Sequence, residues 1–281
     1  MSRRLSYKQK ARLLMIPGLS GFLVFYVIPF LGSFAYAFTN NPLQMQFVGF
    51  ANFVASFQNK YYMLALRNTV IFTIIGVSLI MLFSIVVSVM ISTVGRRIAF
   101  IRMAFILPML LPTAGVALVW RTWLNPNGAL ESTAAFFPGI LGELFSPQMI
   151  PVYLMFVWKY CGFNIILLVA AIASIPHEVY ESAALDGASG LSLHVKITIP
   201  MIRPTVFFAT ILSITNSFRI YKEMYYFYGT DYPPDSVYML QYYMNNLFNK
   251  INYQMLSAGA ILFALIVFVI VVFGYWSDVR S

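Results

Sequence analysis

Six long apolar stretches, each about as long as a lipid bilayer is thick, constrain this chain more than any other feature. They cover residues 13–38, 69–94, 100–124, 149–175, 204–221 and 256–276. A helix needs about 20 apolar residues to cross the ~30 Å hydrocarbon core of a membrane. We therefore expect an all-α, polytopic membrane protein with six transmembrane helices, the first of them bent near Pro17 or Pro29.

The amino-acid composition agrees with a polytopic membrane protein. Of the 281 residues, 60% are hydrophobic and only 10% are charged, whereas soluble proteins carry about 25% charged residues. A soluble enzyme, a disordered chain and a secreted disulfide scaffold are thereby excluded. The single cysteine, Cys161, lies within an apolar stretch, where we expect it to pack as a small hydrophobic residue.

The basic residues predict the orientation in the membrane. The two termini, the second connection and the fourth connection hold eleven Lys and Arg residues, whereas the other connections hold four. Because positive charges stay on the cytoplasmic side, both termini are expected there. The net charge of +9 thus indicates topology rather than nucleic-acid binding. The connections 40–67 and 222–255 are long enough for short interfacial helices.

The connection between the fourth and fifth stretches, residues 174–204, is expected to be structured. Pro176 suits the first turn of a short helix, and Gly187 can adopt the left-handed conformation that ends it. A second helical stretch follows, which Pro200 and Pro204 should bend into the fifth span. Three of the nine acidic residues of the chain lie in this loop.

The loop contains a spaced pattern at Glu181-Ser182-Ala183, Asp186-Gly187-Ala188, Ile197, Ile199-Pro200 and Pro204. This pattern is similar to Glu-Ala-Ala, then Asp-Gly-Ala, then Ile-x-Leu-Pro. The loop therefore resembles the EAA loop of the permease subunits of bacterial ABC importers, and we call it the EAA-like loop. The preceding Trp158, Gly162-Phe163, Ile175-Pro176 and Tyr180 are similar to the carbohydrate branch, the maltose and glycerol-phosphate type.

The resemblance implies a type I ABC importer-like permease fold, in which the EAA loop fits a groove of an ATPase. Residues 1–67 would hold the cytoplasmic N-terminus, the first span and an outer loop, and residues 68–281 would form the permease core. Glu181 would contact the ATPase, and Ser182 and Ala183 would allow close approach. Asp186 would tie the loop to itself or to its partner, and Gly187 would supply the turn.

The resemblance also implies the partners. These are a second homologous permease, two copies of a cytoplasmic ABC ATPase, an external solute-binding protein, a sugar substrate and the lipid of the bacterial inner membrane, with no nucleic acid. The chain contains no G-x-x-x-x-G-K-[ST] motif. We therefore expect no catalytic residue and no cofactor on this chain, with ATP and magnesium bound by the partner ATPase.

Polar residues inside the fourth and fifth apolar stretches are candidates for substrate binding, since they are expensive in lipid. They are Lys159, Asn164, Ser213, Asn216, Ser217 and Arg219. Lys159 and Arg219 either line the pore or extend to the headgroups, and the second explanation is favoured for Arg121. Eight tyrosines between residues 221 and 243 suit either a sugar vestibule or an ordinary interfacial belt, the more common case.

Two rivals from other functional classes remain, and one pattern superficially resembles a metal site. A secondary transporter or channel would also explain the spans, but we expect its acidic groups within the spans, whereas the acidic residues here are assigned to connections and termini. An intramembrane enzyme would need a nucleophile–base pair or a metal at membrane depth, where neither histidine lies. The pattern His177-Glu178-x-x-Glu181 lacks the second histidine of a zinc site, so no metal is expected.

Overall fold

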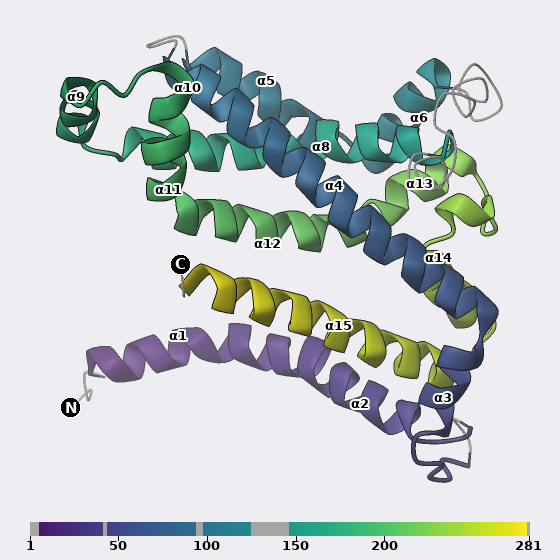
Figure 1. The fold of residues 1–281 in the computed structure, drawn as a ribbon. Coiled ribbons are helices and arrows are strands. Elements are labelled where there is room, and N and C mark those ends of the chain that lie inside the picture. Colours follow the sequence, from purple (N-terminus) through teal and green to yellow (C-terminus); the bar gives the residue numbers. More distant parts are fainter. Residues whose placement is uncertain (1–5, 42–43, 94–97, 125–145, 280–281) are drawn as a thin grey trace. The chain divides into compact units, whose positions relative to one another are not determined.

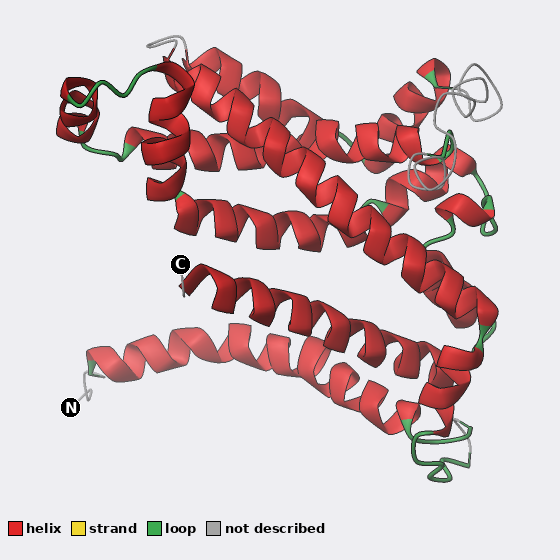
Figure 2. Cartoon of the chain, viewed as in Figure 1, coloured by secondary structure: helices red, strands yellow, loops and turns green. Residues whose placement is uncertain are grey.

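The computed structural model of the chain describes residues 6–41, 44–93, 98–124 and 146–279 (Figure 1). Within these ranges the regular elements are helices (Figure 2), apart from one isolated β-bridge between Thr39 and Phe47. The expected all-α class is confirmed.

Four helical segments are long and apolar enough to cross a membrane, and two bent helix pairs raise the number to six. The four are Arg12–Ala37, Lys60–Thr93, Met149–Ala173 and Tyr253–Val272. They coincide with the first, second, fourth and sixth apolar stretches, and the bent pairs coincide with the third and fifth. Each of the six expected stretches thus contains a helical segment, or a bent pair of segments, that could form a span in the described part of the chain.

The first span consists of α1 (Tyr7–Phe22), the π-helical turn η1 (Leu23–Val27) and α2 (Ile28–Ala37). Instead of a sharp bend at Pro17 or Pro29, the chain stays helical and widens just before Pro29. There the N–H of Ile28 donates to the carbonyl of Leu23. The wide turn accommodates the proline ring, which would otherwise clash with the carbonyl four residues earlier.

The third span is not straight, which corrects the expectation for residues 100–124. It is broken into α5 (Ile98–Leu110) and α6 (Thr113–Trp123), which meet at 107°. Pro112 has an extended backbone, with ψ of 139°, and proline disfavours the helical conformation of the residue before it. The helix therefore ends ahead of Pro112 and starts again after it.

The fifth span is longer than its apolar stretch. It begins with a 75° bend after Gly190–Met201 and then continues through α12 (Arg203–Arg219) and α13 (Tyr221–Tyr228). Pro204 lies in the first turn of α12, where its missing N–H costs nothing. The expected bend into the fifth span is present, but the helical segment ends seven residues beyond residue 221.

The chain forms two compact units, each described here by itself. The first comprises Met1–Met63 and Met244–Val267, with α3 (Ala51–Gln58), the end of α14 (Leu240–Asn249) and most of α15 (Tyr253–Val279). Ala37, Phe53 and Ala258 form its buried cluster. The short helices expected in both long connections are present, including α3 and α14. A domain boundary at residue 67 stays a prediction.

The second unit comprises Leu64–Tyr243 and Phe268–Ser281, and is built around α8 (Met149–Ala173). Helix α4 (Lys60–Thr93), α5 and α12 pack around α8 (Figure 1). Within this unit the helices of the EAA-like loop lie at one end, which we call the loop end. Helices α6 and α13 lie at the opposite end, which we call the far end. Cys161 is buried in α8, as expected.

Candidate coupling loop and buried polar contacts

Helix α9 (His177–Leu185) is the central element of the EAA-like loop. It starts after Pro176, and Glu178 in its first turn offsets the positive end of the helix. It ends at Gly187, which has a φ of +81°. The N–H of Gly187 donates to Ala184 O at 3.1 Å, and the N–H of Ala188 donates to Ala183 O at 2.9 Å.

This pair of hydrogen bonds is the Schellman arrangement, which requires a left-handed residue at the position of Gly187. An L-residue with a side chain pays about 1–2 kcal/mol for that conformation. The left-handed stop expected at Gly187 is therefore present. It ends α9 immediately after the acidic segment and turns the chain toward the second arm of the loop (Figure 1).

Most of the residues expected to contact an ATPase are accessible. Glu181, Ser182 and Asp186 are exposed, and Leu185 beside them is 90% exposed. His177 Nδ1 lies 3.0 Å from Glu181 Oε1, with both side chains in solvent. Such an exposed pair contributes little to stability, so Glu181 remains available to a partner.

Ala183 differs from its neighbours, because it is buried within this chain. It cannot itself offer a small surface to a partner in this conformation. The neighbouring small residues Ser182 and Ala184 are exposed, and they present the open side of α9. The sequence pattern identified the segment correctly but did not distinguish its inner from its outer face.

Thr198 anchors the EAA-like loop, and sequence reasoning missed it. It is fully buried in the π-helical turn η3 (His194–Thr198), which follows α10 (Gly190–Leu193). Its hydroxyl oxygen lies 3.3 Å from the hydroxyl of Tyr180 and 3.2 Å from His194 Nδ1. Thr198 thus ties α9 to the second arm of the loop. The one available signal was a hydroxyl residue between Ile197 and Ile199.

An apolar cluster joins the loop to the membrane helices. Ile202, which follows α11 (Ile199–Met201), is buried against Leu168 and Ile172 of α8. Partly buried residues of α4, α8, α12 and the segment just after α8 complete this cluster: Ile85, Val89, Ala171, Ile175 and Val206. A displacement of the loop is therefore felt directly by three helices, since close-packed interiors transmit strain.

Three of the candidate substrate residues lie in hydrogen bonds between helices. Asn164 of α8 donates to the hydroxyl of Ser213 of α12 at 2.7 Å. Ser217 of α12 lies 3.0 Å from the hydroxyl of Thr73 of α4. All of these side chains are buried. In this conformation their polar atoms serve contacts between helices, where polar groups in a membrane protein find their partners.

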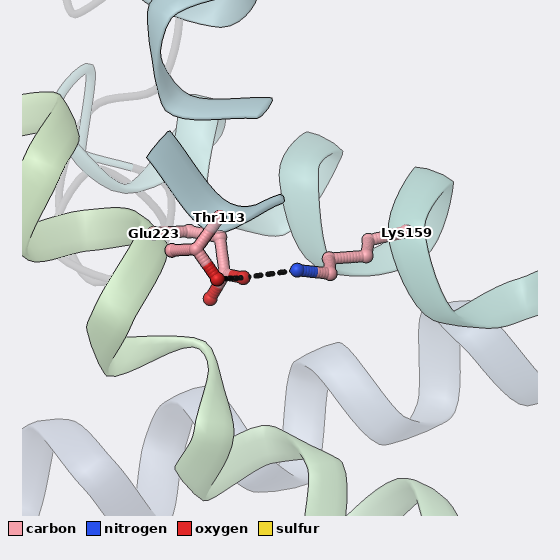
Figure 3. A network of polar contacts seen from close by, with 3 residues as sticks. All are labelled: Thr113, Lys159 and Glu223. Carbon is pink, nitrogen blue, oxygen red and sulfur yellow. Dashed lines mark hydrogen bonds and ion pairs between the residues drawn. The ribbon is translucent and has the colours of Figure 1, made fainter. Parts of the chain in front are cut away.

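Lys159 is buried and forms an ion pair with Glu223 of α13 (Figure 3). Glu223 Oε1 also accepts a hydrogen bond of 3.1 Å from the hydroxyl of Thr113, at the start of α6. Glu223 is only 1% exposed, and its Oε2 has no hydrogen-bond partner among the described residues. Lys159 therefore neither extends to the headgroups nor presents a free charge.

Glu223 corrects the expectation that all acidic residues lie in connections or termini. It belongs to the helical segment Arg203–Tyr228, part of a bent pair that counts as one span. The sequence signal was the apolar face that continues past residue 221, since Met224 and Phe227 beside Glu223 are also buried. With an acid at this position, the argument against a secondary transporter loses its main support.

The remaining candidates have accessible side chains. Asn216 is half-buried and Arg219 is exposed in the last turn of α12. Arg121 is exposed in the last turn of α6. Cations in these positions complement the negative end of a helix.

The tyrosine cluster is mainly a packed element at the far end. Tyr242 is fully buried, with its ring in an edge contact with Tyr221 at 4.8 Å and stacked on Tyr238 at 6.0 Å. Burial raises the pKa of Tyr242, so its phenol stays protonated. Tyr226 and Tyr232 are exposed. These two, rather than the whole cluster, can meet lipid or a partner.

One pocket of about 380 Å³ lies between α4, α5, α6 and α8. Its lining is apolar and includes Phe83, Phe105, Trp120, Trp158 and Cys161. None of the candidate substrate residues lines it, so it is not the polar cavity expected for a sugar. Among the described residues, no group of three or more His, Cys, Asp or Glu side chains is arranged to hold a metal ion.

Comparison with known protein families gives one match. The family described as binding-protein-dependent transport system inner membrane component matches residues 94–280. This range contains the EAA-like loop, α8, α12 and both residues of the buried ion pair.

Curated relatives resemble the chain over most of its length. The lactose transport system permease protein LacF of Rhizobium radiobacter is 26% identical over 86% of this chain and 84% of its own. The sn-glycerol-3-phosphate transport system permease protein UgpA of Pectobacterium atrosepticum is 29% identical over 73% and 72%. The arabinooligosaccharides transport system permease protein AraP of Bacillus subtilis is 29% identical over 82% and 76%.

The fold also matches solved structures. A chain of a bacterial ABC transporter involved in the import of the acidic polysaccharide alginate superimposes with a TM-score of 0.77, at 24% identity, over 96% of this chain and 95% of that one. The same type of transporter in complex with an alginate pentasaccharide-bound periplasmic protein gives a TM-score of 0.74 over 94% and 92%. At this identity the likeness shows a common fold.

Proposed function

Because this chain belongs to the family of inner membrane components of binding-protein-dependent transport systems, we propose that it is the pore-forming subunit of an ATP-driven sugar importer. The observation that carries the proposal is the family match over residues 94–280, which includes an EAA-like loop with an exposed, sharply terminated helix. ATP hydrolysis takes place on a separate chain in this proposal.

The substrate class rests on the relatives. Their names refer to lactose, arabinooligosaccharides and sn-glycerol 3-phosphate, and the structural neighbours import alginate. Lactose, arabinooligosaccharides and alginate are saccharides, and sn-glycerol 3-phosphate is a phosphorylated polyol, so a hydroxyl-rich substrate is what they share and a saccharide is the class that most of them name. Among the residues first considered for substrate contact, Asn216 and Arg219 are the ones with accessible side chains. We assign them to the substrate path, and Lys159, Asn164, Ser213 and Ser217 to contacts between helices.

The coupling role falls to the outer face of α9. Glu181 and Asp186 supply negative charge, and Ser182 and Ala184 allow the backbone of a partner to approach closely. Leu185 of α9 and Leu191 of the following α10 are largely exposed and give the loop an apolar component. A surface that combines exposed apolar and charged side chains suits a groove on another protein. The proposed occupant of this surface is the ATPase.

Movement of α9 reaches the membrane helices in two steps. Thr198 holds Tyr180 of α9, so the loop moves as one piece. The cluster around Ile202 then passes that movement to α8, α4 and α12. Closure of an ATPase dimer on ATP would in this way tilt the membrane helices and alternate the access of the pore.

The assembly consists of this chain, a second homologous permease, two ATPase copies with their ATP and magnesium, and an external solute-binding protein. The excess of Lys and Arg in alternate connections supports an orientation with both termini in the cytoplasm. The EAA-like loop then lies on the side where the ATPase is found. No cofactor is assigned to this chain.

Reconstitution in liposomes tests the proposal. The complete complex is supplied with the binding protein, internal ATP and one of three labelled probes: lactose, an arabino-oligosaccharide or sn-glycerol 3-phosphate. We expect accumulation of one probe that stops when ATP or the binding protein is omitted. Accumulation by this chain alone, without ATP, would contradict the proposal and identify a secondary carrier.

A further inference from the structure

Three contacts fasten α8 to the fifth span at successive levels of the second unit. The cluster around Ile202 lies at the loop end, and the hydrogen bond from Asn164 to Ser213 follows at mid-length. The ion pair of Lys159 with Glu223 lies at the far end. The contacts on α8 recur every four to five residues, as expected for one face of a helix. The two helices therefore form an antiparallel pair that is joined at both ends.

The chemistry at the far end is unusual for a contact whose only role is stability. Lys159 and Glu223 are both almost completely buried. Desolvating two charges costs as much as or more than their attraction returns, and apolar residues of similar size are often equally stable in such a place. Glu223 Oε2 has no partner among the described residues, so the pair is not fully compensated. A role in holding a specific geometry explains this arrangement better than stability does.

A third helix enters the same contact. The break at Pro112 makes Thr113 the first residue of α6, and the N–H groups of a first turn have no partners within their own helix. The hydroxyl of Thr113 donates to Glu223 Oε1. The carboxylate is thereby placed at the positive end of α6, which favours its charge. One acidic side chain thus joins α13 to α8 through Lys159, and to α6 through Thr113 (Figure 3).

At the far end α6 and α13 pack directly on each other, and Trp120 of α6 makes an edge contact with Trp158 of α8. Helix α6 meets α5 at 107° after the break, so α5 does not constrain it as a continuous helix would. Helix α13 follows a turn at Ile220. The ion pair is a buried polar contact that joins α6 and α13 to α8.

Resting on the proposed function, we infer that Lys159 and Glu223 are positioning residues of the transport cycle. They hold α6, α8 and α13 together as one body while the EAA-like loop moves. The movement that starts at α9 then reaches the far end undiminished. It is not absorbed at the break before α6 or at the turn before α13. Neither residue needs to touch the substrate for this role.

Distances between spin labels show directly whether these helices stay together while the EAA-like loop moves. Phe163→Cys in α8 and Tyr226→Cys in α13 place labels at two exposed positions on the helices that the ion pair joins, with Cys161→Ser to remove the native thiol. The complete complex in lipid is measured without nucleotide and with MgATP plus vanadate. In the otherwise unchanged chain we expect one narrow distance distribution, the same in both states. An ion pair that only stabilised the folded monomer would not keep the distance between the labels the same in both nucleotide states.

The variants separate positioning from folding. Glu223→Gln and Lys159→Met each leave a buried polar partner uncompensated, so we expect a distribution at least about twofold wider in one or both states. Lys222→Met removes the charge of the exposed neighbour of Glu223 and should leave the distance distribution narrow.

An unchanged narrow distribution in Glu223→Gln and Lys159→Met would overturn the inference. If these variants do not assemble, Thr113→Val makes the same test, because it removes only the hydroxyl of α6. A wider distribution in Thr113→Val supports the inference and an unchanged one overturns it. Failure of the proposed function has a different signature. In that case a label at Ser182→Cys would not respond to MgATP and vanadate, whatever the labels at the far end report.

Discussion

Gly162 and Phe105 are in backbone contact. A Cβ atom added at Gly162 would lie 1.7 Å from the carbonyl oxygen of Phe105, so α8 and α5 approach each other as closely as a glycine permits. Small residues that allow such approach are the usual means of packing helices in a membrane. This contact holds the first half of the broken third span against α8, and with it the core of the second unit.

Gly162→Ala should therefore destabilise the protein by more than the ~1–3 kcal/mol typical of overpacking, because a backbone atom cannot move aside as a side chain can. Gly115→Ala is the matched control, since no atom lies within 4 Å of a Cβ at that position. The amount of membrane-inserted protein and its thermal unfolding in detergent check this. Equal stability of the two variants would mean that α5 and α8 are further apart than described.

Ser213→Ala should lower stability without changing the apparent affinity for sugar. Ser213 accepts the hydrogen bond of Asn164 in a buried contact, and a net loss of about 0.5–1.5 kcal/mol is expected for one such bond, with more if Asn164 finds no other partner. Thr215→Ala, on the exposed side of α12, is the control. The test is to measure uptake as a function of sugar concentration. An increase in the half-saturation constant of Ser213→Ala would show that Ser213 contacts the substrate.

The sequence predicted the spans and the loop helix because both depend on local properties. Twenty apolar residues in a row are enough to predict a membrane span. A proline before a short segment and a glycine after it are enough to predict where a short helix begins and ends. The break at Pro112 was missed because prolines within spans are often tolerated, as Pro17, Pro29 and Pro108 are here. Pro112 differs because its own backbone is extended.

The roles of the buried polar residues could not be read in this way. Asn164 and Ser213 are 49 residues apart in the chain, and Lys159 and Glu223 are 64 apart. Polarity within an apolar stretch shows that a partner is needed, but it does not say whether that partner is a substrate or another helix. The packing of α4 and α8 against the fifth span supplies helix partners for four of the six candidates in this conformation, and a role of the six in substrate binding stays a prediction.

Thr198→Val should uncouple the loop while leaving the fold intact. The change keeps the shape of the side chain but removes the hydroxyl that lies next to both Tyr180 and His194. We expect ATP hydrolysis by the complex to continue while uptake falls several-fold, since α9 would move without its second arm. Thr122→Val, at an exposed position of α6, controls for the loss of a hydroxyl. Equal loss of ATP hydrolysis and uptake would indicate a defect in assembly instead.

Gly187→Val should impair uptake more than Gly187→Asn. Both replacements must adopt a φ of +81°, and a β-branched residue tolerates this far less well than asparagine does. The Schellman turn would open, and the acidic face of α9 would lose its fixed direction. Comparable uptake by the two variants, at equal protein levels, would argue that the turn has no part in coupling.

Glu181→Lys provides the most direct test of the claim that this chain is driven by an ATPase bound at α9. The side chain is exposed and its partner His177 is also in solvent, so charge reversal should leave insertion and folding unchanged. The measurement is ATP-dependent uptake of the transported probe by the reconstituted complex, with Glu178→Lys on the same helix for comparison. We expect Glu181→Lys to abolish uptake at normal protein levels; uptake at the rate of the unchanged chain would contradict the account.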